Sequence, residues 1–142
     1  MAHVTFKGGV FPHKRKRFTR EKALEEYLPK GDLIYPLRQH IGGTAVPVVA
    51  VGDRVLEGQL LAKASGDISA PVHASVSGTV KAIEPRKTVS GKEILSVVVE
   101  NDGLYEKMPV SEIKPWQELE VGERLRRIQE AGVVGMGGAG FP

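Results

Sequence analysis

The sequence predicts a mainly β domain, built as a small barrel or sandwich, with a helical segment on either side. Three observations support this prediction. Short segments rich in β-branched residues fill positions 41–100, and turn signals separate them at intervals of about eight to twelve residues. Helical patterns lie only outside this region. With 142 residues, the chain is long enough to bury one substantial core.

The first two expected strands flank a turn. Residues 46–51 are rich in valine and end at Gly52 and Asp53, a pair of residue types that favours tight turns. Residues 55–62 then resume an extended pattern, which is interrupted at positions 57–58. We therefore expect a strand, a tight turn and a second, broken strand.

The second half of this region repeats the pattern. After a loop tip at residues 65–67, extended structure is expected at 76–83 and, most clearly, at 92–100. Residues 47–55 resemble residues 71–80, with one insertion, at an offset of 24 positions. This offset is consistent with two related hairpins that wrap around each other.

The segment before the strands predicts one short helix. Thr19 is a candidate N-cap, residues 20–28 follow it with helix-forming types, and Pro29 would stop the helix. After a Gly-Asp turn, residues 33–37 are expected to be extended.

The segment after the strands changes character. Residues 104–115 contain two prolines and are expected to form a linker, whereas residues 116–131 predict a helix that stops at Gly132. Three apolar residues can share one face of that helix: Leu119, Leu125 and Ile128.

The composition excludes several chemistries. Because the chain has no cysteine, it can provide no disulfide, thiolate nucleophile or cysteine-ligated metal. No two of the four histidines are three or four positions apart, so no metal site is expected. We interpret His40 and His73 as hydrogen-bonded structural residues. No apolar run approaches the roughly 20 residues of a membrane span, so we expect a soluble chain made in the cytosol.

Much of the positive charge lies near the N-terminus. Five consecutive basic residue types occupy positions 13–17, and the net charge of the chain is +3. Such a run could meet phosphate, an acidic partner or an anionic membrane surface, or it could form a solvated loop, which we favour. No aromatic residues are interleaved with it, so we do not expect nucleic-acid binding.

Two segments resemble the biotinyl and lipoyl carrier domains. Residues 51–62 are similar to the opening half of such a domain, and residues 74–80 to its closing half. The resemblance implies a barrel-sandwich hybrid with its core at about residues 41–100. At the hairpin tip, where a carrier has its attachment lysine, this chain has Asp67, and Lys63 lies back in the preceding strand. We therefore expect no covalent cofactor.

The last ten residues are rich in glycine. Gly135, Gly137 and Gly140 satisfy the spacing G-x-G-x-x-G, but a helix precedes them where a dinucleotide-binding fold requires a strand. We therefore discount a Rossmann fold. Closely spaced glycines still allow backbone N–H groups to approach an anion such as phosphate.

The residue order at this end is more specific than the glycine spacing. Residues 131–142 resemble the start of the flavin domain in the NADH-binding subunit of respiratory complex I, and residues 137–142 are similar to its FMN and NADH loop. Together with residues 6–10, 36–42 and 69–80, they resemble the RnfC family, which belongs to the Rnf electron-transport complexes.

The resemblance implies a function and a division of the chain. Residues 1–103 would form the RnfC-type N-terminal region, residues 104–115 a linker, and residues 116–142 the final helix and the start of a truncated FMN- and NADH-binding domain. The chain would be a non-catalytic scaffold and docking fragment of a peripheral subunit on the cytoplasmic side of the membrane. That subunit would belong to an ion-translocating ferredoxin:NAD oxidoreductase, with the other subunits of the complex as partners.

The resemblance also implies cofactors, although the chain alone would hold none of them. FMN, NADH and 4Fe-4S clusters are expected for the longer parent protein, with no catalytic or metal-binding residue here. The candidate cofactor-binding residues all lie in the terminal loop: Gly135, Gly137, Gly138, Ala139, Gly140 and Phe141. The alternative is an unmodified biotinyl/lipoyl-like adaptor domain that binds other proteins.

Overall fold

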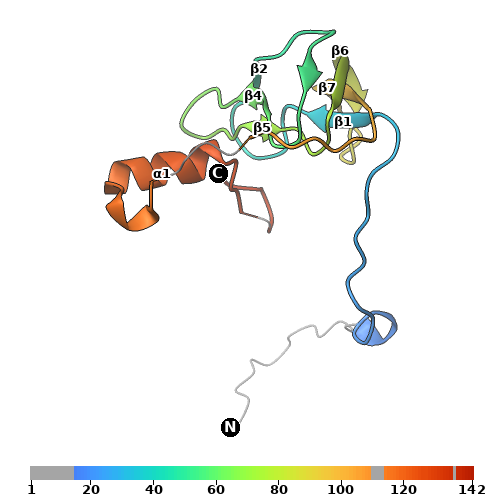
Figure 1. Ribbon diagram of the computed structural model, residues 1–142, viewed down its shortest axis with the longest axis horizontal. Helices are drawn as coiled ribbons and strands as arrows, with labels where there is room; N and C mark the ends of the chain where they lie inside the picture. Colours follow the sequence, from blue (N-terminus) through green and yellow to red (C-terminus); the bar gives the residue numbers. More distant parts are fainter. Residues whose placement is uncertain (1–14, 110–113, 136) are drawn as a thin grey trace.

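The protein is described by a computed structural model that covers residues 15–109, 114–135 and 137–142. Residues 6–10, His13, Lys14 and part of the expected linker lie outside these ranges. The described chain is mainly β, as predicted (Figure 1). A four-stranded antiparallel sheet has the order β1 (Leu33–Pro36), β7 (Glu93–Asn101), β6 (Gly78–Lys87) and β3 (Arg54–Val55). A three-stranded antiparallel sheet has the order β2 (Val46–Pro47), β4 (Leu60–Lys63) and β5 (Val72–His73).

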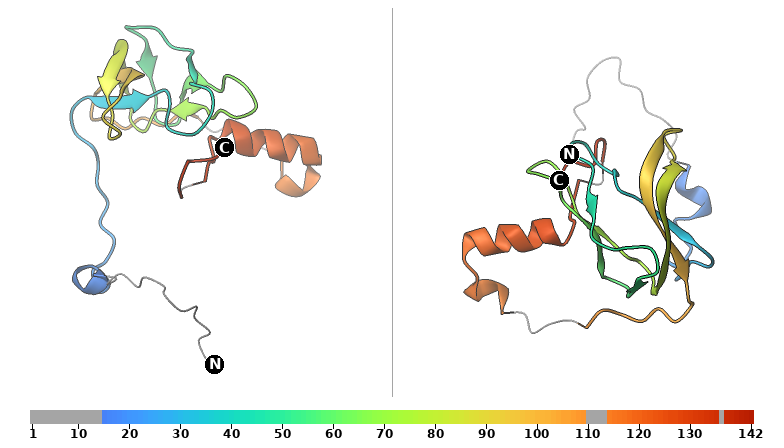
Figure 2. Two further views of the ribbon diagram at one scale, coloured as in Figure 1. Left: turned by 180° about the vertical axis from the view of Figure 1, so that it is seen from behind. Right: turned by 90° about the horizontal axis from the view of Figure 1, so that it is seen from above.

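The hairpin of β6 and β7 is the longest element of the fold and is clearest in the right-hand view of Figure 2. The register shifts between Val80 and Ala82, where Lys81 forms a bulge. Val97 and Val99 of β7 are completely buried. The predicted strand at 92–100 is confirmed, and its valine-rich centre is part of the core.

The core lies between the two sheets. It contains β-branched and leucine side chains from both of them, so each sheet covers the apolar face of the other. The fully buried members with the largest side chains are Leu37, Val55, Leu61, Val76, Val80, Val97 and Val99. The strand pattern of the sequence therefore identified the region that forms the core.

The pairing of β3 with β6 brings the two similar segments, residues 47–55 and 71–80, into contact. Arg54 pairs with Thr79, and Val55 pairs with Gly78. The ends of the two segments therefore lie side by side in one antiparallel ladder.

Three glycines near β3 and β6 have different roles. Gly52 and Gly58 have φ angles of +93° and +88°, so the predicted turn at Gly52 is confirmed and Gly58 allows the break in the second strand. Gly78 is instead the first residue of β6, where a Cβ atom would overlap the carbonyl oxygen of Glu100. Close approach of the two backbones therefore explains this glycine.

Two of the expected strands are shorter than predicted. The strand expected at 46–51 is limited to β2, because the Asp53 carboxylate accepts the Ala50 N–H at 2.7 Å and turns the chain. The strand expected at 55–62 is divided into β3 and β4, with the break at Gly58 as anticipated.

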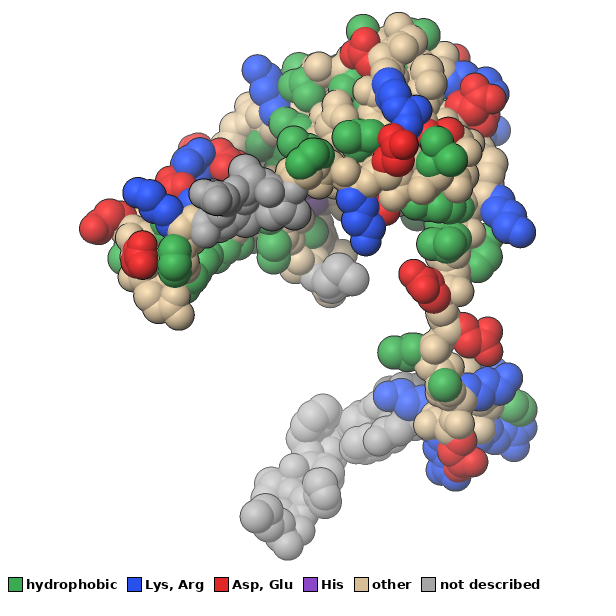
Figure 3. Space-filling model, in the orientation of Figure 1, with side chains coloured by type: hydrophobic (Ala, Val, Ile, Leu, Met, Phe, Trp, Pro, Cys, Tyr) green, Lys and Arg blue, Asp and Glu red, His purple; other side chains and the backbone are tan. Residues whose placement is uncertain are grey.

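The helix predicted at 20–28 is absent, and this prediction was wrong. A short 3-10 helix, η1 (Lys16–Phe18), precedes it, and Thr19 follows η1 rather than capping a new helix. Leu24 and Tyr27 are 103% and 80% exposed, so no tertiary contact stabilises a helix that is too short to be stable alone. The described N-terminal segment, residues 15–28, extends away from the barrel (Figure 3).

The C-terminal helix is shorter than predicted. A 3-10 turn, η2 (Trp116–Glu118), is separated from α1 (Val121–Glu130) by an extended bend at Leu119, whose side chain is buried. The expected face of Leu119, Leu125 and Ile128 is therefore divided, with Leu125 63% exposed. Gly132 ends the helix with a φ of +71°, as predicted.

The chain after β7 remains attached to the barrel. Ser77, which is completely buried, donates its hydroxyl to the Asp102 carboxylate at 2.7 Å and accepts the Glu106 N–H at 2.9 Å. Arg54 forms ion pairs with both Asp102 and Glu106. These contacts hold the first part of the expected linker on the surface beside β3.

A candidate cofactor loop held against the barrel

The hairpin tip between β4 and β5 is fixed at its base to Gly42 and Gly43, which lie in the segment before β2. Gly43 donates its N–H to the Ile68 carbonyl at 2.9 Å, and the buried Ser69 hydroxyl donates to the Gly43 carbonyl at 3.0 Å. Gly42 has a φ of +95°, and a Cβ there would overlap the Ile68 carbonyl oxygen. In this structure the base of the tip is therefore anchored, whereas the side chains of residues 65–68 are exposed.

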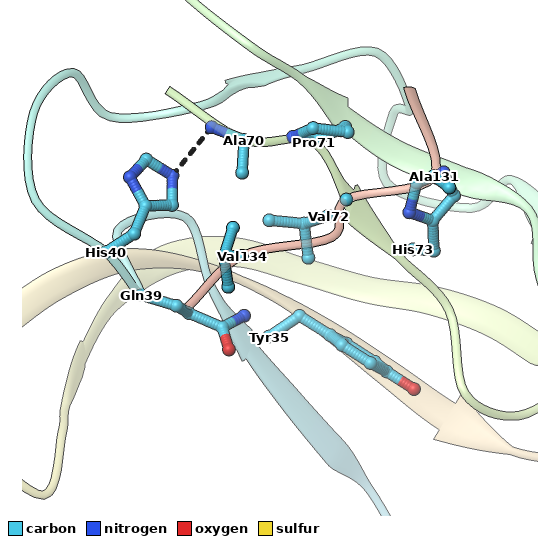
Figure 4. Close-up of a pocket in the computed structure, with 10 residues that line it drawn as sticks. Tyr35, Gln39, His40, Ala70, Pro71, Val72, His73, Ala131 and Val134 are labelled. Carbon is cyan, nitrogen blue, oxygen red and sulfur yellow. Dashed lines mark hydrogen bonds between the residues drawn. The ribbon is translucent and has the colours of Figure 1, made fainter. Parts of the chain in front are cut away.

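His40 adds a further link to this tip. Its Nε2 accepts the N–H of Ala70 at 2.9 Å (Figure 4). Its Nδ1 lies 2.8 Å from the Ile41 carbonyl oxygen. Since Nε2 is the acceptor, the proton of the neutral ring is on Nδ1 and is donated to Ile41. The expectation of a hydrogen-bonded structural histidine is confirmed for His40.

The glycine-rich end folds back on itself beside this histidine. Gly135 donates its N–H to the Phe141 carbonyl at 2.7 Å, which closes the loop. Ile41 donates its N–H to the Ala139 carbonyl at 2.9 Å, which attaches the loop to the barrel. Residue 136, inside the loop, is outside the described ranges.

The candidate cofactor-binding residues differ in what surrounds them. A Cβ at Gly140, whose φ is +60°, would lie 3.3 Å from the carbonyl oxygen of Gln39, so this glycine faces the barrel. At Gly137 and Gly138 a Cβ would meet nothing within 4 Å, so these glycines face open space. Phe141 is 59% exposed. One side of the loop is therefore anchored, and the other side is open to solvent.

A cavity of about 320 Å³ separates the start of this loop from the barrel. Figure 4 shows Tyr35, Val72 and His73 on the barrel side and Val134 on the loop side. Burial lowers the pKa of His73 from its ordinary value of 6.5, because the charged imidazolium is poorly solvated there. The neutral form of His73 is therefore favoured in the wall of this cavity, which apolar side chains such as Val72 and Val134 also line.

The sequence did not identify the anchoring role of His40, Ile41 and Gly132. A Cβ at Gly132 would lie 3.1 Å from the Pro71 carbonyl oxygen, so this glycine serves both as a helix stop and as a close contact with the barrel. The available signal was indirect: His40 and Pro71 lie within the two motifs that carried the family resemblance.

Other kinds of site have no counterpart in the part of the chain that the structure describes. Within residues 15–109, 114–135 and 137–142, no three histidine or acidic side chains gather closely enough to hold a metal ion. Over the same residues, no helix has the length and apolar character needed to cross a bilayer.

The fold and the fixed tip together define a barrel-sandwich hybrid domain that has no attachment lysine at its hairpin. Comparison with known proteins gives the family. Residues 4–104 match the family described as the RnfC barrel sandwich hybrid domain. The chain therefore belongs to the RnfC family.

Curated relatives agree with this assignment, and each is the C subunit of a larger complex. Over 99% of its length the chain is 42% identical to that of the Na⁺-translocating ferredoxin:NAD⁺ oxidoreductase complex of Acetobacterium woodii. It is 43% identical, over 97%, to that of the proton-translocating ferredoxin:NAD⁺ oxidoreductase complex of Clostridium ljungdahlii. It is 37% identical, over 96%, to that of the ion-translocating oxidoreductase complex of Vibrio cholerae. The chain spans 32%, 30% and 18% of these three relatives.

Proposed function

We propose that the chain is the N-terminal scaffold and docking domain of a peripheral electron-transfer subunit. The complex would be a membrane ion-translocating ferredoxin:NAD oxidoreductase, and the subunit would lie on the cytoplasmic side of the membrane. Support comes from the three relatives, which are named as parts of ion-translocating oxidoreductase complexes. Within the subunit, residues 1–103 would form the barrel region, residues 104–115 the connection, and residues 116–142 the beginning of the cofactor domain.

One structural observation carries the scaffold role: the glycine loop is hydrogen-bonded to the barrel. The Ile41 N–H to Ala139 carbonyl bond fixes the position of the loop, and His40 fixes Ile41 in turn through its ring. A loop of small residues has high conformational entropy, so an external anchor reduces the cost of holding it ready for a ligand. The barrel would supply that anchor.

The loop fits part of a flavin and dinucleotide site. Gly137 and Gly138 have no neighbour on the side where a Cβ would stand, which leaves room for an anionic group to reach the backbone. FMN, when bound, would supply hydride and electron transfer with NADH. Residues 135–141 would bind and orient the cofactors, whereas cysteine ligands for iron–sulfur clusters would come from elsewhere in the longer protein, because this chain has none.

The proposal predicts a difference between the chain alone and the longer protein. One loop cannot surround a cofactor, so the 142-residue chain should purify without flavin absorbance and should not oxidise NADH. A longer protein that continues beyond residue 142 should retain FMN. A colourless longer protein, or a yellow 142-residue chain, would contradict the proposal.

A pair of glycine variants in the longer protein tests the loop itself. Gly140→Val introduces a β-branched side chain at a φ of +60° and close to Gln39, and should lower the flavin content by roughly tenfold. Gly66→Ala, at a position with open space and no positive φ, should leave the flavin content unchanged. Equal flavin content in both variants would place the cofactor away from this loop.

A further inference from the structure

A second groove, of about 890 Å³, lies beside the glycine loop. Gly138 and Ala139 of the loop line it, together with residues of the turn between β6 and β7. Gln39 and His40 line both this groove and the smaller cavity beneath the loop. The groove is therefore adjacent to the candidate site.

The groove carries unbalanced positive charge. Arg38, Lys87 and Lys92 line it, and no acidic residue does. Among the described residues, none of these three cations forms an ion pair. Glu93 is opposite Lys87 in the β6–β7 ladder, yet the two charged groups do not meet. Several other cations on the barrel are paired, such as Lys81 with Asp32 and Arg54 with Asp102.

Apolar side chains lie between these charges. Ile34 and Ile41 are 47% and 48% exposed, and Val89 at the hairpin turn is fully exposed. These three apolar residues line the groove together with the three cations. An exposed apolar patch rimmed by polar or charged side chains marks a site of protein–protein interaction.

We propose that this groove docks an acidic segment, with interspersed apolar side chains, from another subunit of the complex. This proposal rests on the proposed function, because it requires a partner subunit. Carboxylates of the segment would meet Arg38, Lys87 and Lys92, and its apolar side chains would cover the exposed isoleucines. The groove is large enough for several residues, and charge complementarity selects the partner.

Recognition would act through side chains rather than through strand addition. β1 is an edge strand, which is the kind of strand that a partner peptide can extend. However, it ends at Pro36, which has no N–H to donate, and the Pro36 carbonyl already accepts the Gln39 side chain at 3.0 Å. Specificity therefore depends on the cations and isoleucines of the groove.

The test uses photo-crosslinking in the complete complex, purified in mild detergent from the membranes of its own cells. Val89 is replaced by p-benzoylphenylalanine, and Val51, an exposed valine in the turn before β3, serves as the control position. The expected result is a crosslink from position 89, but not from position 51, to one Asp- and Glu-rich segment of another subunit. Mass spectrometry of the crosslinked peptides identifies that segment.

Charge variants sharpen this test. Lys92→Glu should lower the crosslink yield at position 89 by roughly threefold or more, as should about 0.5 M NaCl, because both weaken exposed charge pairs. Lys63→Glu, at the end of β4 and away from the groove, should change nothing. A crosslink within the same chain, a partner segment without acidic residues, or suppression by millimolar pyrophosphate or NADH would overturn the proposal. Failure to purify with any other subunit would instead contradict the proposed function.

Discussion

The ring of His40 accepts the backbone N–H of Ala70, thirty residues away, at 2.9 Å. The other ring nitrogen lies 2.8 Å from the carbonyl oxygen of Ile41, whose own N–H is bonded to the glycine loop through Ala139. One neutral imidazole thus connects the hairpin tip of the barrel to the segment that anchors the candidate cofactor loop.

Replacing this histidine should loosen both contacts. In His40→Ala the buried Ala70 N–H loses its acceptor, which should lower the free energy of unfolding by about 1–3 kcal/mol. Hydrogen exchange should become faster at the amides of Ala70 and Ile41. Gln39→Ala, which removes only an exposed bond to the Pro36 carbonyl, is the control. An unchanged exchange rate at the Ala70 amide would show that its hydrogen bond to His40 does not contribute to stability.

The partial burial of His73 should make the protein less stable in mild acid. Because burial lowers the pKa of His73, the unfolded chain takes up a proton at a higher pH than the folded chain does. The contribution of the neutral ring is fully present above about pH 7 and is lost as the pH falls through the unfolded value toward the lowered folded one. Urea unfolding at about pH 7.5 and pH 5.5 measures this loss.

The variant His73→Gln removes the titrating group from this position. It should reduce the pH dependence of the unfolding free energy, while His40 remains in both proteins as a constant. Identical pH dependence in the variant and the parent protein would mean that His73 is not the cause.

Gly78→Ala should destabilise the barrel. The added methyl group would overlap the Glu100 carbonyl oxygen where β6 pairs with β7, and both backbones are fixed there by hydrogen bonds. We expect a loss of roughly 1–3 kcal/mol, measured by thermal or urea unfolding. Gly66→Ala, in the loop tip, should lie within about 0.5 kcal/mol of the parent protein. Equal stability of the two variants would contradict the close approach at Gly78.

Restoring a lysine at the hairpin tip should not restore a carrier domain. In Asp67→Lys the chemical group for an amide bond is present, but the Gly43 N–H to Ile68 carbonyl bond and the Ser69 hydroxyl still hold the tip against the preceding segment. We expect intact-mass spectrometry, after expression with biotin or lipoate ligase, to show mainly unmodified protein. Substantial modification would show that the fixed base of the tip does not prevent recognition by the ligase.

Local patterns predicted the strands well and the helices less well. The valine-rich run of β7 was recognisable because alternating and continuous apolar residues directly encode burial in a sheet. The helix predicted at 20–28 had suitable residue types and a stop signal, but Leu24 and Tyr27 have no packing partner in the described chain. Helix propensity over nine residues cannot offset the cost of ordering without such contacts.

The prediction of the C-terminal helix was inaccurate for a related reason. Its pattern predicted one element from Trp116 onward, whereas the backbone bends at Leu119 so that this single side chain is buried. Where a helix begins depends here on a tertiary contact, which propensity alone does not contain.

By itself, the sequence determined that the hairpin tip has no attachment lysine, that the chain can ligate no cluster through cysteine, and that a glycine-rich loop with a distinctive residue order follows the barrel. These are statements about which chemical groups are present. Only the tertiary structure decided that Gly43 fixes the tip at Ile68, that His40 reaches Ala70, and that Ile41 holds Ala139. Each of these contacts joins residues that are far apart in the chain, and local periodicity does not specify which distant backbone groups meet.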